Sequence, residues 1–175
     1  HLMAPQTAVF GIFSFIVGAV CALAAGMLWD GKWWQTPLLL LIFIGLWFSH
    51  KIGRSAYIMA VVFYGSGFVT SVFSGIVGRK WLAGKNILLK SIAVFLISYS
   101  AMVTNTALVN YLMLLVYQTP AITWKLLAFQ SPVERLLFSA GSLIIGMPLL
   151  LGLPKIGIAV GPQEEELPDG EIDEA

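Results

Sequence analysis

Charged residues are scarce in this 175-residue chain, and acidic residues are nearly confined to its end. Charged side chains make up 11% of the sequence and hydrophobic ones 58%, whereas about a quarter of the residues of a soluble domain are charged. Of the nine acidic residues, only Asp30 and Glu134 precede residue 163. This composition excludes an ordinary soluble domain and indicates a membrane protein. With a formal net charge of +1, the chain is not expected to bind nucleic acid.

The residue types on which catalysis and metal binding depend are also rare. Residues 1–3 are typical of a vector remnant ending in a start methionine, which leaves His50 as the one histidine to consider. The single cysteine, Cys21, excludes a disulfide within the chain and a cysteine metal cluster. Intramembrane catalysis needs paired carboxylates, a serine with a histidine, or an aspartate-rich metal motif. We therefore expect no enzymatic activity, no cofactor and no metal.

Long apolar runs are what the chain has in abundance. A helix needs about 20 such residues to cross a membrane, and five segments qualify. A break at residues 104–106 of the fourth would give a sixth. We expect an all-α polytopic membrane protein, with five or six transmembrane helices bundled within residues 4–160 and an acidic, disordered tail at 161–175. The expected spans cover residues 8–28, 33–49, 56–78, 87–117 and 132–153.

The sequence "SPVE" carries a signal for the start of the fifth span. Ser131 is placed as the N-cap, Pro132 at the first helical position and Glu134 three residues after the cap, which is a capping box. The preceding residues 120–130 are expected to form a short helix at the membrane surface. Under this interpretation no ionisable residue lies at the centre of a span, and proton-coupled pumping is not favoured.

Basic residues predict the orientation, because cytoplasmic loops carry an excess of Lys and Arg. The side of the membrane with more Lys and Arg is expected to be the cytoplasmic side, and the C-terminus is expected to lie there. The membrane is expected to be the cytoplasmic membrane of a bacterium or archaeon. On that side Arg79, Lys80 and Lys85 are candidates for docking a partner or anionic lipid. The richer side holds Lys32, Arg79, Lys80, Lys85, Lys90 and Lys155, and the poorer side Lys51, Arg54 and Lys125.

A polar stripe marks the fourth span. At about 100° per residue, four of its side chains fall close to one line, and Asn105 lies on a flank. Such groups either hold helices together or line a path for a solute. Trp33 and Trp34, in "WDGKWW", form either an aromatic belt or the lid of a binding site. The stripe consists of Tyr99, Thr106, Asn110 and Tyr117.

Small residues recur every three or four positions in the first and third spans, a pattern that lets helices approach closely. We expect these two faces to pack on each other, or either face to receive a separate subunit or a second copy. The residues are Ser14, Gly18, Ala22 and Gly26 in the first span, and Gly67, Ser71, Ser74 and Gly78 in the third.

Three functions are compatible with these features. The first is a protein that binds or translocates a small neutral or weakly polar solute through a cavity lined by the fourth helix, as the membrane component of a larger transporter. The alternative is a non-catalytic structural or assembly subunit of a membrane complex. The third is a lipid-processing enzyme using Glu134 or Asp30. Membrane lipids and other subunits are the expected partners.

Overall fold

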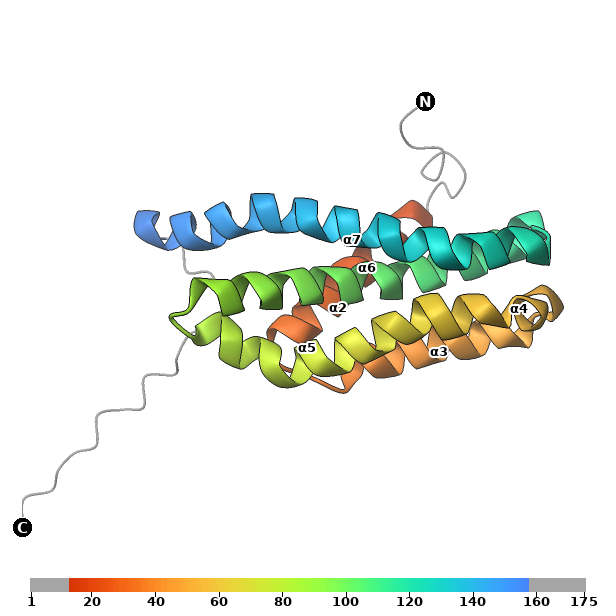
Figure 1. Ribbon diagram of the computed structural model, residues 1–175, viewed down its shortest axis with the longest axis horizontal. Coiled ribbons are helices and arrows are strands. Elements are labelled where there is room, and N and C mark those ends of the chain that lie inside the picture. The colour runs from red at the N-terminus through yellow and green to blue at the C-terminus, as the bar shows by residue number, and fades with distance from the viewer. Residues whose placement is uncertain (1–12, 158–175) are drawn as a thin grey trace, which may run out of the picture.

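The computed structural model describes residues 13–157, which form a bundle of helices running lengthwise through the molecule (Figure 1). In this part of the chain no residue belongs to a strand. The expectations for residues 1–3, for the start of the first span and for the acidic tail lie outside it. The elements are α2 (Phe13–Trp29), α3 (Gln35–Ser49), α4 (Lys51–Ser55), the π-helix η1 (Met59–Tyr64), α5 (Gly65–Ala83), α6 (Ile87–Tyr117), α7 (Ala121–Gly152) and the 3₁₀-helix η2 (Leu153–Ile156).

Three helical segments are long and apolar enough to cross a membrane, namely Met59–Ala83, Ile87–Tyr117 and Ala121–Ile156. The fold is therefore a helical bundle suited to a membrane, as its composition predicts. α2 and α3 have 17 and 15 residues. At about 1.5 Å per residue, α3 and the described part of α2 are shorter than the roughly 30 Å hydrocarbon core. The expected count of five spans thus stays a prediction.

α6 is the central helix and contacts α2, α3, α5 and α7. It begins after Asn86, whose side-chain oxygen accepts a hydrogen bond from the N–H of Leu88 at 2.9 Å, as N-caps do. It ends before Gln118, whose φ of 47° takes the backbone out of the helix. α6 covers the residues 87–117 expected for the fourth span, and the alternative break at 104–106 does not occur.

Gly67 and Gly78 of α5 pack on α6, and the small-residue faces of α5 and α2 do not pack on each other as expected. Gly67, Ser71, Ser74 and Gly78 are all buried. A Cβ placed on Gly67 would lie 2.7 Å from the Cβ of Val103 on α6, closer than two carbon atoms can approach. The face therefore brings two backbones together, but with a different neighbour.

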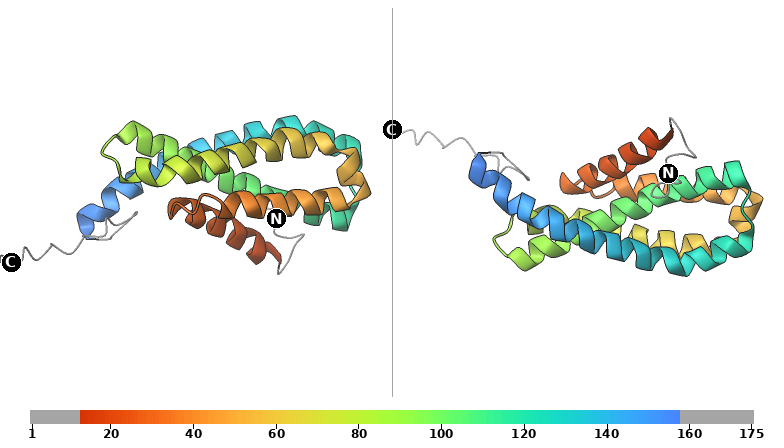
Figure 2. Two further views of the ribbon diagram at one scale, coloured as in Figure 1. Left: turned by 90° about the horizontal axis from the view of Figure 1, so that it is seen from below. Right: turned by 90° about the horizontal axis from the view of Figure 1, so that it is seen from above.

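The small-residue face of α2 is open. Gly18, Ala22 and Gly26 are exposed, and a Cβ placed on either glycine would meet no atom within 4 Å. The side chain of Ser14 lies outside the described part of the structure. α2 uses its other face, with Ala24 and Leu28 buried, and runs along one side of the bundle (Figure 2).

The helix start expected at Ser131 is wrong. α7 begins at Ala121 and passes through Ser131 and Pro132 without a break, so the predicted surface helix and span are one helix. Its first turns are held by packing, because Trp124 and Ala128 belong to the main buried cluster. The local capping signal is overridden by this burial. As a result Glu134 does not cap a helix and lies in the middle of one.

Candidate functional site

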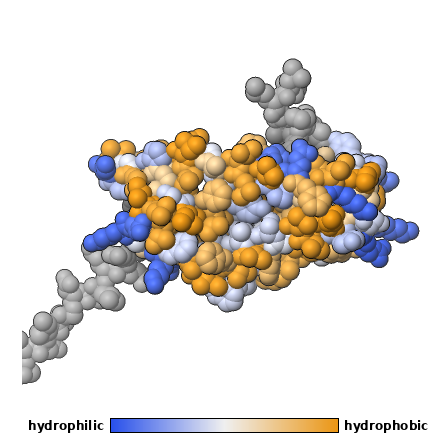
Figure 3. Space-filling model, viewed as in Figure 1, coloured by the Kyte–Doolittle hydropathy of each residue, from blue (hydrophilic) through white to orange (hydrophobic). Residues whose placement is uncertain are grey.

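Glu134 and Arg135, which we call the charged pair, interrupt an otherwise apolar helix at mid-length. The most apolar stretch of this helix, with a mean hydropathy of 2.1, begins directly after the pair and covers residues 136–153. The surface is mostly hydrophobic, and Figure 3 shows a hydrophilic patch near mid-length along its upper edge. The nearest charged residues along the chain are Lys125 and Lys155, about 15 Å and 30 Å away at 1.5 Å per residue. Lys125 lies near the α6–α7 turn, so the pair sits about 15 Å from that end of the helix.

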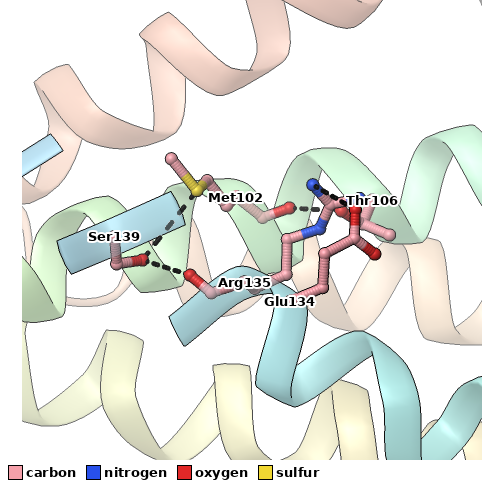
Figure 4. Close-up of polar contacts among 5 residues, drawn as sticks. All are labelled: Met102, Thr106, Glu134, Arg135 and Ser139. Atoms are coloured by element: carbon pink, nitrogen blue, oxygen red, sulfur yellow. Dashed lines mark hydrogen bonds and ion pairs between the residues drawn. The ribbon is translucent and has the colours of Figure 1, made fainter. Parts of the chain in front are cut away.

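Arg135 projects from α7 toward α6, near Met102 and Thr106 (Figure 4). Its side chain is 21% exposed and that of Glu134 is 47% exposed. The guanidinium carbon lies 5.6 Å from the centre of the Phe138 ring, within the range of a cation–π contact. One turn further, the hydroxyl of Ser139 contacts the Met102 sulfur at 3.8 Å. Arg135 is thus held mainly by apolar and weakly polar groups.

The guanidinium is poorly satisfied within the described residues. Its contact with Glu134 joins Nη1 to Oε1 at 4.0 Å, which is too long for a hydrogen bond. Its Nε is buried without a hydrogen-bond partner in the part of the chain that the structure describes. Arginine carries five N–H donors, and unpaired buried donors are costly. The charged pair therefore has binding capacity that the fold itself does not use.

Part of the polar stripe on α6 joins helices of the same chain. The hydroxyl of Tyr99 is 2.7 Å from that of Ser66 on α5. Ser66 donates to the carbonyl of Phe63 at 2.7 Å, so Tyr99 is the donor between the two hydroxyls. One turn along α5, Ser100 donates to Thr70 at 3.1 Å.

Asn110 makes the second long-range bond of the stripe. Its amide donates to the hydroxyl of Tyr64 in η1 at 3.1 Å. Tyr64 is fully buried beside Trp47, whose ring is edge-on to it with centroids 5.8 Å apart. Trp124 of α7 packs edge-on against Trp47 at 5.1 Å. This aromatic cluster joins α3, η1, α6 and α7 at one end of the bundle.

The remaining predicted solute-binding residues are not gathered in one place. Thr106 donates to the carbonyl of Met102 in its own helix at 2.7 Å. Tyr117 is 49% exposed, and Trp33 and Trp34 are each 52% exposed. Asn105 lies on another flank of α6, and its buried Oδ1 has no hydrogen-bond partner among residues 13–157.

The loop residues singled out by the sequence have local partners. Asp30 and Lys32 form an ion pair at 3.4 Å, and Arg79 packs over Gly31. Arg79, Lys80 and Lys85 are exposed at the α5–α6 end. His50 accepts a hydrogen bond from the N–H of Ile52 at 3.3 Å and so caps α4. In the described range no three His, Cys, Asp or Glu side chains are placed to hold a metal ion.

Arg135 is the residue that sequence reasoning missed. The capping box placed it in the first turn of a helix, where an arginine at a membrane border needs no explanation. The available signal was its position in a nearly uncharged run that continues from residue 126 to residue 154. Comparison with protein-family models, with curated proteins and with solved structures finds no match to the chain.

Proposed function

We propose that the chain is a non-catalytic subunit of a membrane complex, with five helices crossing the membrane and the basic α5–α6 turn in the cytoplasm. α2 and α3 would span with the help of Trp33 and Trp34 at their shared turn. Each is short for a span, and tryptophan is the residue type that occupies the interface at such ends.

The observation that carries this proposal is the charged pair in the middle of α7. Charged residues deep in a membrane are costly and usually mark a functional contact. Glu134 is about half exposed, and the two groups are only 4.0 Å apart at their closest. A neighbouring protein helix would shield both charges from lipid and supply hydrogen bonds. The protein therefore has a reason to work in contact with another membrane segment.

The polar stripe supports the same proposal. Its deepest groups, Tyr99 and Asn110, bond to Ser66 and Tyr64 of neighbouring elements. Interhelical hydrogen bonds of this kind average about 0.6 kcal/mol in membranes. The stripe then stabilises the bundle, and solute handling is not needed to explain it.

A second candidate is the binding of a small polar solute. Two unpartnered polar atoms favour it, the buried Oδ1 of Asn105 and the buried Nε1 of Trp47. A solute carrying both a donor and an acceptor would satisfy such groups. The two atoms lie on different helices, and Trp47 is fully buried, so this candidate ranks second.

Substitution of Asn110 with leucine, followed by native mass spectrometry of protein gently extracted from its own membrane, separates the two functions. For an assembly subunit we expect a bound protein chain in both wild type and variant, with the variant less stable by about 1 kcal/mol or less. A stoichiometric small molecule that is bound by the wild type and lost in the variant would instead establish the solute function. Tyr57→Phe, at an exposed residue outside the stripe, is the control for general effects of substitution.

A further inference from the structure

We propose that two copies of this chain associate side by side through α7, so that Glu134 of each copy pairs with Arg135 of the other. This inference rests on the proposed function as a membrane subunit and names its partner. The charges of the pair, their depth and the surface beside them each support it.

The pair cannot satisfy itself within one helix. Adjacent residues on a helix point about 100° apart and do not face each other. The observed separation of 4.0 Å between Nη1 and Oε1 reflects this geometry. Both groups therefore retain unmet hydrogen-bonding capacity, and lipid chains provide none.

A second copy supplies the complementary charges at the right depth. Glu134 and Arg135 differ in height by only about 1.5 Å along the helix. A two-fold axis along the membrane normal places each carboxylate opposite the guanidinium of the other copy, because contacts across such an axis are reciprocal. An anion bound by Arg135 alone would be repelled by the adjacent Glu134. The site is thus complementary to itself.

The surface beyond the pair is open for such contact. Phe138, Ile145 and Leu149 are exposed by 52%, 67% and 52%. At about 100° per residue they lie within roughly 30° of the direction midway between Glu134 and Arg135. Glu134 lies at the edge of this apolar strip, whereas Arg135 leans toward α6 with only part of its side chain exposed. A second copy packed on the strip would cover Glu134 and meet the exposed part of the guanidinium.

Two variants that each reverse one charge of the pair test this arrangement. Glu134→Arg gives a chain with two positive charges at the site, and Arg135→Glu a chain with two negative ones. Association is measured by energy transfer between labelled copies in lipid vesicles, with circular dichroism as the check on folding. We expect wild-type chains to associate, each variant alone to associate at least about tenfold more weakly, the loss of roughly 1.4 kcal/mol, and an equimolar mixture of the two variants to recover association.

Recovery in the mixture is the decisive result, because pairing within one chain cannot produce it. Wild-type chains that stay monomeric, or variants that each associate as strongly as wild type, would overturn the proposal. If the variants fail to fold, crosslinking replaces them. In a Cys21→Ser background, Phe138→Cys is expected to form a disulfide between copies, and Val69→Cys, on the exposed face of α5, is expected not to. A folded Phe138→Cys chain that crosslinks no more than the Val69→Cys control would also refute it.

Failure of this inference can be told apart from failure of the proposed function. A monomeric chain that co-purifies with a different protein in fixed ratio would refute the dimer and leave the assembly role standing. A chain that associates neither with itself nor with any protein would refute both.

Discussion

The two long interfaces of α6 differ in how they treat polar groups. Against α5, hydroxyls pair across the helices, Ser66 with Tyr99 and Thr70 with Ser100. Against α7, the hydroxyl of Ser139 contacts the sulfur of Met102 at 3.8 Å. The Nε of Arg135 has no hydrogen-bond partner among the described residues. In the most apolar stretch of η1 and α5, residues 60–77, 39% of the residues are buried, and in that of α7, residues 136–153 beyond the charged pair, 11% are buried. The α5 side is complete within one chain, whereas α7 has groups suited to a further neighbour.

Replacing the charged pair by apolar residues should have the largest effect and would sharpen this comparison. We expect the double variant Glu134→Leu, Arg135→Met to raise the stability of the isolated chain by about 1–3 kcal/mol, because it removes the buried Nε of Arg135 that has no partner among the described residues. Thermal unfolding in detergent measures it. The same variant should lose association in vesicles. A less stable double variant would mean that the pair stabilises the single chain after all.

Adding a methyl group at the close contact between α5 and α6 should lower the stability of the chain. Gly67→Ala places a methyl group against Val103, and overpacking of this kind costs about 1–3 kcal/mol. Gly18→Ala on α2 is the matched control, because its added Cβ meets nothing within 4 Å. Removing a helical glycine there should stabilise the chain slightly, by up to about 1 kcal/mol. Equal destabilisation by both variants would show that α2 also packs tightly.

Removing one hydroxyl from the α5–α6 interface should have the smallest effect. Tyr99→Phe deletes the bond to Ser66 and is expected to lower the free energy of unfolding by about 0.6 kcal/mol. Tyr117→Phe, at an exposed position, should change it by less. Denaturation monitored by circular dichroism can compare the two variants side by side. Identical values would argue that the Tyr99 bond contributes nothing net, and that packing alone distinguishes the two interfaces.

Sequence reasoning predicted the helical membrane architecture and the bounds of α6 because these depend on signals within one segment. The apolar length of this run can be recognised from the segment alone. The start of α7 was mispredicted because the burial of Trp124 and Ala128 in the core decided it, and that burial depends on helices distant in sequence.

The site was predicted only in part for the same reason. The stripe on α6 follows from helical periodicity, but its partners do not. Tyr64 and Ser66 lie where the π-helix η1 gives way to α5, and π-helical turns have no clear sequence signal but are frequent at functional sites. The importance of Arg135 became visible only when α7 proved to be continuous.

The continuity of α7 also has a consequence for how the protein is made. A helix with two charges near its middle enters the bilayer reluctantly from the insertion channel, since each central charge costs about 2.5–3.5 kcal/mol on insertion scales. α6 is synthesised just before α7, and its Met102 and Thr106 lie beside Arg135. Retention of α6 next to the channel would give α7 a surface to fold against as it leaves. In that case α6 would assist the insertion of α7, and removal of α6 is expected to lower the fraction of α7 that inserts.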